Sequence, residues 1–132
     1  MILVDTSVLI DYLKGKNTPS VSHLEKALEL VVPLGITGQI YQEVLQGAAT
    51  EKEFETLKKY LSSYTFYAPE DERETFSEAA RLFFECRKKG YTVRSTVDCL
   101  IFQIAREQQL KLLHSDRDFE VMRRIHPEVE FF

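Results

Sequence analysis

No stretch of this sequence approaches the roughly 20 consecutive apolar residues that a membrane-spanning helix needs, so we expect no membrane segment. The opening MILVDTSVLIDYLKG also lacks a basic stretch ahead of its apolar run, and Asp5 lies inside that run. We therefore interpret this opening as a buried strand followed by a helix, and not as a secretion signal.

Cysteine is scarce, because Cys86 and Cys99 are the only two and they form no C-x-x-C pair. Both lie among apolar neighbours in segments that we expect to be helical. We predict that they are buried free thiols in a reducing compartment. Together with the missing membrane segment and secretion signal, this indicates a cytoplasmic protein.

The chain also lacks an excess of positive charge, since its formal net charge is −4. A protein that coats nucleic acid needs many Lys and Arg side chains for the phosphates, so this class is disfavoured. An enzyme that contacts RNA around an acidic centre remains compatible with the charge.

Several signatures of other enzyme classes are missing. The nucleotide-binding patterns G-x-G-x-x-G and G-x-x-x-x-G-K-[ST] do not occur, and no serine lies in a nucleophile-elbow sequence. A phosphatase of the haloacid-dehalogenase type needs a second Asp two residues after the first. Here Ser7 follows Asp5 at that distance, which disfavours phosphotransfer through Asp5.

Internal repeats, low-complexity tracts and Gly/Ser-rich or Pro-rich linkers are absent too, and 132 residues suit a single domain spanning 1–132. Short apolar segments alternate with segments of helical periodicity, which predicts an α/β fold with a parallel sheet covered by helices. The expected strands are 1–5, 33–37, 65–68, 111–114 and an edge strand at 129–132. The helices are expected to begin near residues 6, 19, 38, 50, 70, 95 and 117.

Apolar spacing also predicts which helix faces are buried. In the helix expected at 70–89, the side chains assigned to the core are Phe76, Ala79, Ala80, Phe83 and Phe84. Further apolar positions assigned to buried helix faces include Leu28, Val31 and Val97.

Four acidic residues lie near the predicted carboxyl ends of the strands. Asp5 and Asp116 fall at or just beyond two strand ends, while Glu43 and Asp98 lie in the first half of helices that begin near the same edge. Sites in open parallel sheets form at this edge, so we expect the four carboxylates to converge. Such carboxylates repel one another unless some are protonated or a cation binds, and oxygen ligands favour Mg²⁺ or Mn²⁺.

Each acid also has an ordinary structural explanation when it is taken alone. Asp5 can cap the helix after the first strand, and Asp116 or Asp118 can cap the last one. Asp98 can complete a capping box, and Glu43 is typical of a solvated helix residue. The metal site is indicated by the position of all four acids at one edge of the predicted sheet. No single acid indicates it alone.

Four segments carry these acids in order along the chain. VDTSVLIDYL contains Asp5, QIYQEVLQG contains Glu43, VRSTVDCLIFQIA contains Asp98, and LLHSDRDFE contains Asp116. They resemble the four motifs of the PIN-domain nucleases, and more closely those of the VapC-type toxins of bacterial and archaeal toxin–antitoxin pairs. The resemblance spans Met1 to about Arg124, which is nearly the whole chain.

The resemblance implies a PIN-like three-layer α/β/α sandwich with a central, mostly parallel sheet of four to five strands. It also implies a toxin that is a Mg²⁺- or Mn²⁺-dependent endoribonuclease and hydrolyses RNA phosphodiester bonds with a metal-activated water. The implied catalytic and metal-binding residues are Asp5, Glu43, Asp98 and Asp116. The implied supporting residues are Thr6, Ser7 and Asp118, with Arg94 as a contact to substrate phosphate. His114 departs from the family, which often has threonine there.

The resemblance further implies two kinds of partner besides the RNA substrate. A VapB-type antitoxin would hold the toxin inactive by inserting an arginine into the acidic pocket, and the toxin would form a homodimer. The alternative is a catalytically inactive PIN domain that binds RNA or protein. Inactive members usually lose one or more of the acids, and all four are present here.

Overall fold

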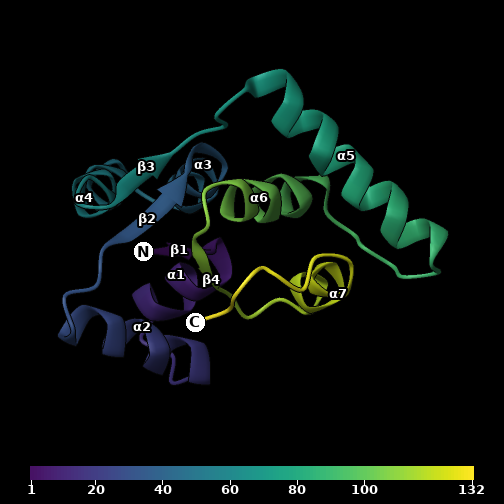
Figure 1. The fold of residues 1–132 in the computed structure, drawn as a ribbon. Helices are drawn as coiled ribbons and strands as arrows, with labels where there is room; N and C mark the ends of the chain where they lie inside the picture. Colours follow the sequence, from purple (N-terminus) through teal and green to yellow (C-terminus); the bar gives the residue numbers. More distant parts are fainter.

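The computed structural model describes all residues from 1 to 132 and contains four strands and seven helices (Figure 1). The strands are β1 (Ile2–Val4), β2 (Leu34–Thr37), β3 (Thr65–Tyr67) and β4 (Lys111–Leu113). The helices are α1 (Thr6–Leu13), α2 (Pro19–Glu29), α3 (Gly38–Gln46), α4 (Glu51–Leu61), α5 (Glu72–Lys88), α6 (Thr96–Glu107) and α7 (Arg117–Ile125). None of these helices is long and apolar enough to cross a membrane.

The four strands form one parallel sheet in the order β3-β2-β1-β4. The three residues of the central strand β1 are all buried, as expected for a parallel sheet that is covered on both faces. Gly35 in β2 is required by close packing, because a Cβ there would collide with the ring of Tyr67 in β3. The predicted α/β class and the parallel sheet are confirmed.

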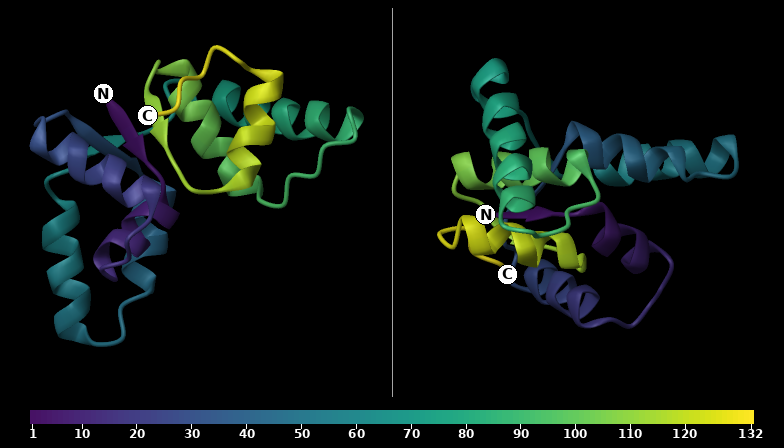
Figure 2. Two further views of the ribbon diagram at one scale, coloured as in Figure 1. Left: turned by 90° about the horizontal axis from the view of Figure 1, so that it is seen from below. Right: turned by 90° about the vertical axis from the view of Figure 1, so that its right-hand side faces the viewer.

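The chain crosses the sheet in two directions from β1. The connections from β1 to β2 and from β2 to β3 run one way, and the connection from β3 to β4 returns to the other side of β1. Right-handed crossovers therefore place α1–α4 on one face and α5–α7 on the other. The left panel of Figure 2 shows the two groups of helices on opposite sides of β1, which confirms the three-layer arrangement. The strand order reverses between β1 and β4, and ligands of such sheets bind at this point.

Every helix begins with a polar side chain that accepts a hydrogen bond from a backbone N–H of the first turn. Three of these N-caps directly follow strands or lie close to a strand end, namely Asp5 after β1, Thr37 at the end of β2 and Asp116 after β4. The other N-caps are Thr18, Thr50, Asp71 and Ser95. At the carboxyl edge of the sheet, the helices therefore begin with carboxylate and hydroxyl groups that can also bind a ligand.

The predicted buried face of α5 is wrong for three of its five residues. Phe76 and Phe84 are each 48% exposed, and Ala80 is exposed as well. The face that packs against α6 contains Thr75, Ala79, Leu82 and Cys86. Two faces of this helix carry apolar residues at helical spacing. The buried face is harder to recognise from the sequence because it contains the polar Thr75. The Thr75 hydroxyl donates a hydrogen bond to the carboxylate of Glu107, at 3.0 Å from Oε1 and 2.8 Å from Oε2.

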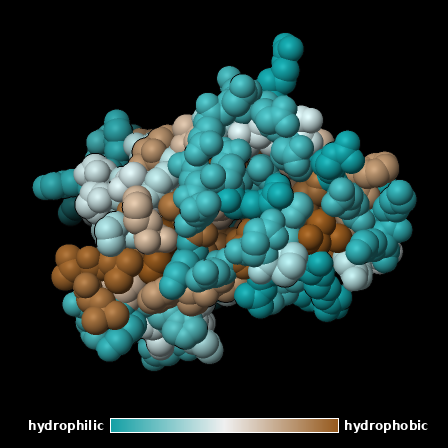
Figure 3. All heavy atoms as spheres, viewed as in Figure 1, coloured by the Kyte–Doolittle hydropathy of each residue, from teal (hydrophilic) through white to brown (hydrophobic).

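Three other apolar positions assigned to the core are exposed because they lie at helix ends. α2 stops at Glu29, so Val31 falls beyond it in a left-handed turn (φ 55°) and is 84% exposed, while Leu28 is 42% exposed. Val97 lies in the first turn of α6 and is 37% exposed. Figure 3 shows a hydrophobic patch at the lower left, where Figure 1 places the end of α2.

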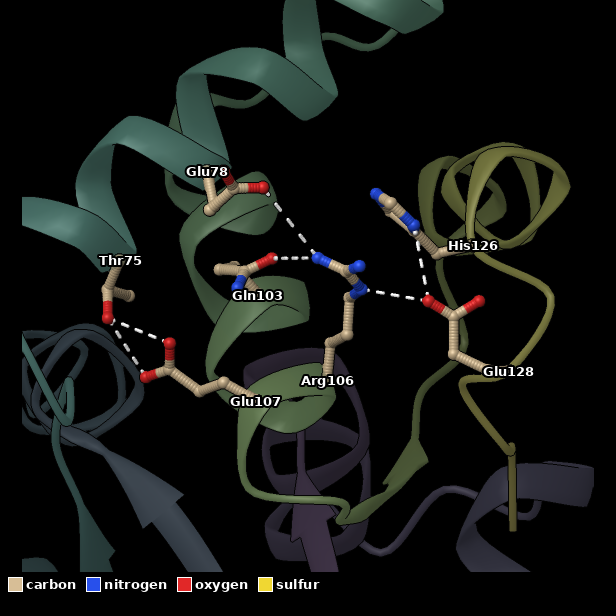
Figure 4. A network of polar contacts seen from close by, with 7 residues as sticks. All are labelled: Thr75, Glu78, Gln103, Arg106, Glu107, His126 and Glu128. Atoms are coloured by element: carbon tan, nitrogen blue, oxygen red, sulfur yellow. Dashed lines mark hydrogen bonds and ion pairs between the residues drawn. The ribbon is translucent and has the colours of Figure 1, made fainter.

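Of the edge strand expected at 129–132, only one isolated parallel bridge to β4 forms, between Leu112 and Phe131. Side chains at the end of α6 also hold the C-terminal segment (Figure 4). Arg106 donates from Nε to Glu128 at 2.8 Å and reaches Glu78 of α5 at 3.8 Å. This network fastens α5, α6 and the C-terminal segment together at the end of the sheet where β4 begins.

The prediction for the two cysteines is confirmed as far as their burial and free state are concerned. Cys86 and Cys99 are buried and form no disulfide. Burial raises the pKa of both thiols, that of Cys99 to about 12, so both stay protonated at neutral pH. They act as small apolar side chains in the packing of α5 and α6.

Candidate metal centre

Asp5 lies immediately after β1 and is 5% exposed. Its backbone N–H donates to the carbonyl of Leu113 in β4 (2.9 Å), which anchors it at the point where β1 and β4 meet. Its carboxylate accepts from the Ser7 hydroxyl at 2.6 Å and from the Ser7 N–H at 3.2 Å. Burial raises the pKa of Asp5, and repulsion from Glu43 adds to the rise, although the hydrogen bonds from residues 6 and 7 lower it.

Asp98 reaches the same point from the opposite layer. Ser95 caps α6 and accepts from the Asp98 N–H at 3.1 Å, which places Asp98 in the first turn. No return hydrogen bond from the Ser95 N–H to the carboxylate forms, so Asp98 does not complete a capping box. Burial, followed by repulsion from neighbouring carboxylates, raises the pKa of Asp98 to about 7. Those neighbours, in order of decreasing effect, are Asp5, Asp116, Glu43 and Asp118.

Glu43 lies in the second turn of α3, which Thr37 begins at the end of β2. It is partly buried, and its charge raises the pKa of both Asp5 and Asp98. The charges of Asp5, Glu43 and Asp116 all raise the pKa of Asp98, so the four acids lie in one region, with α3 and the end of β1 on one side and α6 and the end of β4 on the other.

Asp118 belongs to this group more closely than its sequence position beside Asp116 suggests. Carboxylate oxygens of Asp98, Asp116 and Asp118 all lie within 4.8 Å of one another. Asp116 caps α7 by accepting from the Asp118 N–H (2.9 Å), and Asp118 is 4% exposed. Asp118 in turn accepts from the backbone N–H of Arg94 at 2.9 Å, which ties the loop before α6 to α7.

Arg94 contributes mainly through its backbone. Its side chain is 74% exposed, and the guanidinium approaches the Asp118 carboxylate to 3.8 Å, so water strongly screens this ion pair. The Arg94 guanidinium is therefore accessible to a negatively charged ligand at the protein surface. No ion pair forms between a basic side chain and Asp5, Glu43, Asp98 or Asp116.

Thr6 and Ser7 differ in what they do. The Ser7 hydroxyl is used by Asp5, whereas the Thr6 Oγ1 is buried and has no hydrogen-bond partner. An unpaired buried hydroxyl costs free energy unless a ligand or a water uses it. The site therefore offers oxygen ligands and has no compensating cation. The raised carboxyl pKa values of Asp5 and Asp98 and the unpaired Thr6 hydroxyl are consistent with this. Such a site suits a hard divalent ion such as Mg²⁺ or Mn²⁺.

His114 also contacts the acidic region, and the sequence did not predict this contact. Its Nδ1 accepts from the backbone N–H of Asp116 at 3.1 Å, and its side chain is only 7% exposed. Burial lowers the pKa of His114, so the ring is neutral and able to accept at neutral pH. The only signal in the sequence was the unusual residue type two positions before Asp116.

One hollow of the molecule lies away from the acids. It measures about 610 Å³ and is lined by residues such as Arg106, Lys111 and Glu128, near the start of β4. The acids lie at the other end of β4, so charge and not cavity size identifies the candidate site.

Comparison with known proteins agrees with this fold. The PIN domain family matches residues 2–125, and the chain belongs to this family. It is 30% identical over 126 residues to ribonuclease VapC11 of Mycobacterium tuberculosis, covering 95% of this chain and 93% of VapC11. The resemblance proposed from the four motifs is confirmed.

Solved structures confirm the fold. VapBC-1 from nontypeable Haemophilus influenzae matches with a TM-score of 0.75 at 16% identity, over 100% of this chain and 97% of the other. VapBC2 from Rickettsia felis, bound to a DNA fragment from its promoter, matches with a TM-score of 0.72 at 15% identity, over 100% and 98%.

Proposed function

We propose that this protein is a divalent-metal-dependent endoribonuclease and the toxin of a VapBC-type toxin–antitoxin pair. The observation that carries the proposal is the gathering of Asp5, Glu43, Asp98 and Asp116 at the switch point of the sheet without a cationic partner. Membership of the PIN domain family and a relative named as a ribonuclease support the reaction class.

The four acids would hold Mg²⁺ or Mn²⁺, either directly or through waters, and Asp118 would assist on the α7 side. A divalent ion so bound lowers the pKa of a coordinated water and stabilises negative charge on a phosphate. The raised pKa values of Asp5 and Asp98 support this assignment, since the acids remain crowded unless a cation compensates them.

The remaining residues orient the reactants. Ser7 fixes the Asp5 carboxylate through two hydrogen bonds, so its free lone pairs point in a defined direction. The unpaired hydroxyl of Thr6 is available to hold the attacking water or a phosphate oxygen. Asp118 fixes the backbone of Arg94, and the exposed side chain of Arg94 would contact a phosphate of the RNA.

The partners follow from the same assignment. The structural matches include toxin–antitoxin complexes, which supports a VapB-type antitoxin as the partner of this chain. An arginine of that antitoxin would be attracted by the uncompensated acids. The homodimer, the single domain and the cytoplasmic location expected from the sequence stay predictions.

The proposal is tested by RNA cleavage with conservative variants. Asn caps helices as well as Asp does, so Asp5→Asn and Asp116→Asn remove charge while they keep the helix N-caps. Asp71→Asn is the matched control, because Asp71 caps α5 in the same way and lies outside the acidic group.

We expect Mg²⁺- or Mn²⁺-dependent cleavage by the wild type and by Asp71→Asn, and loss of at least about 100-fold in the Asp5 and Asp116 variants. Chelation of the metal should abolish cleavage by the wild type. Undiminished cleavage by Asp5→Asn would exclude the proposed mechanism.

A further inference from the structure

His114 lies between the candidate metal centre and the C-terminal segment. Its ring packs edge-on against Phe131, with centroids 4.3 Å apart, and at a tilt against Phe119, with centroids 5.1 Å apart. Its Nδ1 accepts the hydrogen bond from the backbone N–H of Asp116. The ring therefore contacts a metal-centre residue through Nδ1 and two aromatic side chains through its carbon and nitrogen framework.

The direction of this hydrogen bond defines the tautomer of His114. A neutral imidazole has one protonated nitrogen, and Nδ1 accepts here, so the proton lies on Nε2. Nε2 faces the carboxylate of Glu120 at 3.7 Å, on the exposed side of α7. That arrangement favours the tautomer which Asp116 needs.

The C-terminal segment holds the ring in this orientation. Its backbone is fastened to β4, because Leu112 donates to Glu130 at 2.9 Å and accepts from Phe132 at 3.1 Å. The guanidinium of Arg123 also packs over the Phe131 ring, 4.0 Å from its centroid. His114 thus contacts two aromatic rings, and neither ring belongs to the acidic group.

We infer that His114 is a positioning residue, which holds Asp116 at the metal centre by accepting its backbone N–H, and that Phe131 keeps the imidazole in place. The inference rests on the proposed function in one respect only, namely that Asp116 is a ligand. Without the acceptor, the N–H of Asp116 loses its partner and the turn at 114–116 relaxes, which moves the carboxylate. Loss of an outer partner of a metal ligand typically weakens metal affinity about 10–100-fold.

A matched pair of variants tests the hydrogen bond itself. His114→Asn and His114→Leu have side chains of similar size, but only Asn provides an oxygen that can replace Nδ1 as the acceptor. The measurement is Mn²⁺ binding to the protein without RNA, by titration calorimetry or by the electron paramagnetic resonance signal of free Mn²⁺. We expect the Leu variant to lose about 10-fold or more in affinity, and the Asn variant to recover most of it.

Two further variants separate positioning from packing. His114→Phe keeps a ring between Phe119 and Phe131 and has no acceptor, so it should bind Mn²⁺ as weakly as the Leu variant. It also serves in place of the Leu variant if that one does not fold. His126→Leu is the control, because His126 is a half-buried histidine that faces Glu128 at 3.3 Å and lies at the other end of α7. It should bind Mn²⁺ like the wild type.

Two results would overturn the inference. One is wild-type Mn²⁺ affinity in the Leu or Phe variant, and the other is an equal loss in the Asn and Leu variants, which would assign the effect to packing. Failure of the proposed function is distinguishable, since it appears as a wild type that binds Mn²⁺ and cleaves no RNA.

Discussion

Asp5 and Asp116 each combine two tasks in one carboxylate. Both cap a helix, as Asp71 does at α5, and both also stand at the carboxyl ends of neighbouring strands. A cap needs only an oxygen that accepts a hydrogen bond, whereas a metal ligand needs negative charge. The ordinary explanation of each aspartate as a helix cap is therefore correct and compatible with a place in the metal centre.

Thr6 allows stability and function to be separated. Thr6→Val removes a buried hydroxyl that has no partner in the structure, with little change of shape. We expect an unchanged or higher free energy of unfolding, because an unsatisfied buried hydroxyl costs about 1–3 kcal/mol. RNA cleavage should fall by about 10-fold or more, because the hydroxyl is free to orient a water or phosphate.

Thr37→Val is the matched control for Thr6→Val. The Thr37 hydroxyl is also fully buried, but it caps α3 by accepting from the Ile40 N–H at 3.3 Å. This variant should lose about 1 kcal/mol of stability in urea unfolding. A Thr6 variant that is destabilised as much as the Thr37 variant and cleaves RNA normally would contradict the assigned role.

Asp98 should make the metal-free protein less stable as the pH rises. Its pKa is 3.8 in the unfolded chain and about 7 in the folded protein. Between these values the folded state holds a proton that the unfolded state has released, so the free energy of unfolding falls as pH increases towards 7. Thermal unfolding in the presence of a chelator should show this fall in the wild type and a flatter profile in Asp98→Asn. Parallel profiles would show that Asp98 is not crowded by the other acids.

At the scale of elements, helix α5 shows what periodicity can and cannot predict. A helix is predicted over 70–89 and α5 spans Glu72–Lys88, but three of the five residues assigned to its buried face are exposed. Hydrophobic spacing marks Phe76, Ala80 and Phe84 as strongly as it marks Ala79 and Leu82. The choice depends on contacts with α6 that are distant in sequence, including the hydrogen bond from Thr75 to Glu107. Local sequence patterns therefore predict where a helix forms. They do not predict which face is buried when two faces carry apolar residues.

The observed orientation of α5 predicts a clear difference between two substitutions. Leu82→Ala truncates a fully buried side chain against α6 and should cost about 2–5 kcal/mol. Phe84→Ser replaces a side chain that is 48% exposed and should cost about 1 kcal/mol or less. Equilibrium urea unfolding followed by circular dichroism measures both. A larger loss for Phe84→Ser would favour the orientation expected from the sequence.

At the scale of the whole molecule, the acids lie where the two halves of the chain meet. Asp5 and Glu43 come from the half that contains α1–α4, whereas Asp98 and Asp116 come from the half that contains α5–α7. This meeting could be predicted from the sequence, because strand ends and helix starts in a parallel sheet share one edge. The role of His114 could not, because it depends on the C-terminal segment crossing β4 and on the direction of one hydrogen bond.

A divalent ion at this junction should stabilise the whole fold. At about 100 times its dissociation constant it raises the free energy of unfolding by about 2.7 kcal/mol, which corresponds to a rise in Tm on the order of 10 °C. Thermal unfolding at pH 8 with MgCl₂ or MnCl₂ measures this, and KCl at equal ionic strength is the control for screening. The rise should be smaller at pH 5.5, because Asp98, with its pKa of about 7, then holds a proton that the ion must displace.

The same measurement distinguishes two positions for the ion. If it binds all four acids, Asp5→Asn and Asp116→Asn should each reduce the rise in Tm, because each removes a ligand from one half of the chain. Asp98, Asp116 and Asp118 are close enough together to bind an ion without the other half. An ion held only there would leave the rise intact in Asp5→Asn and abolish it in Asp116→Asn. The Asp5 variant therefore decides whether the metal joins the two halves of the molecule, since only the four-acid centre needs a ligand from the end of β1.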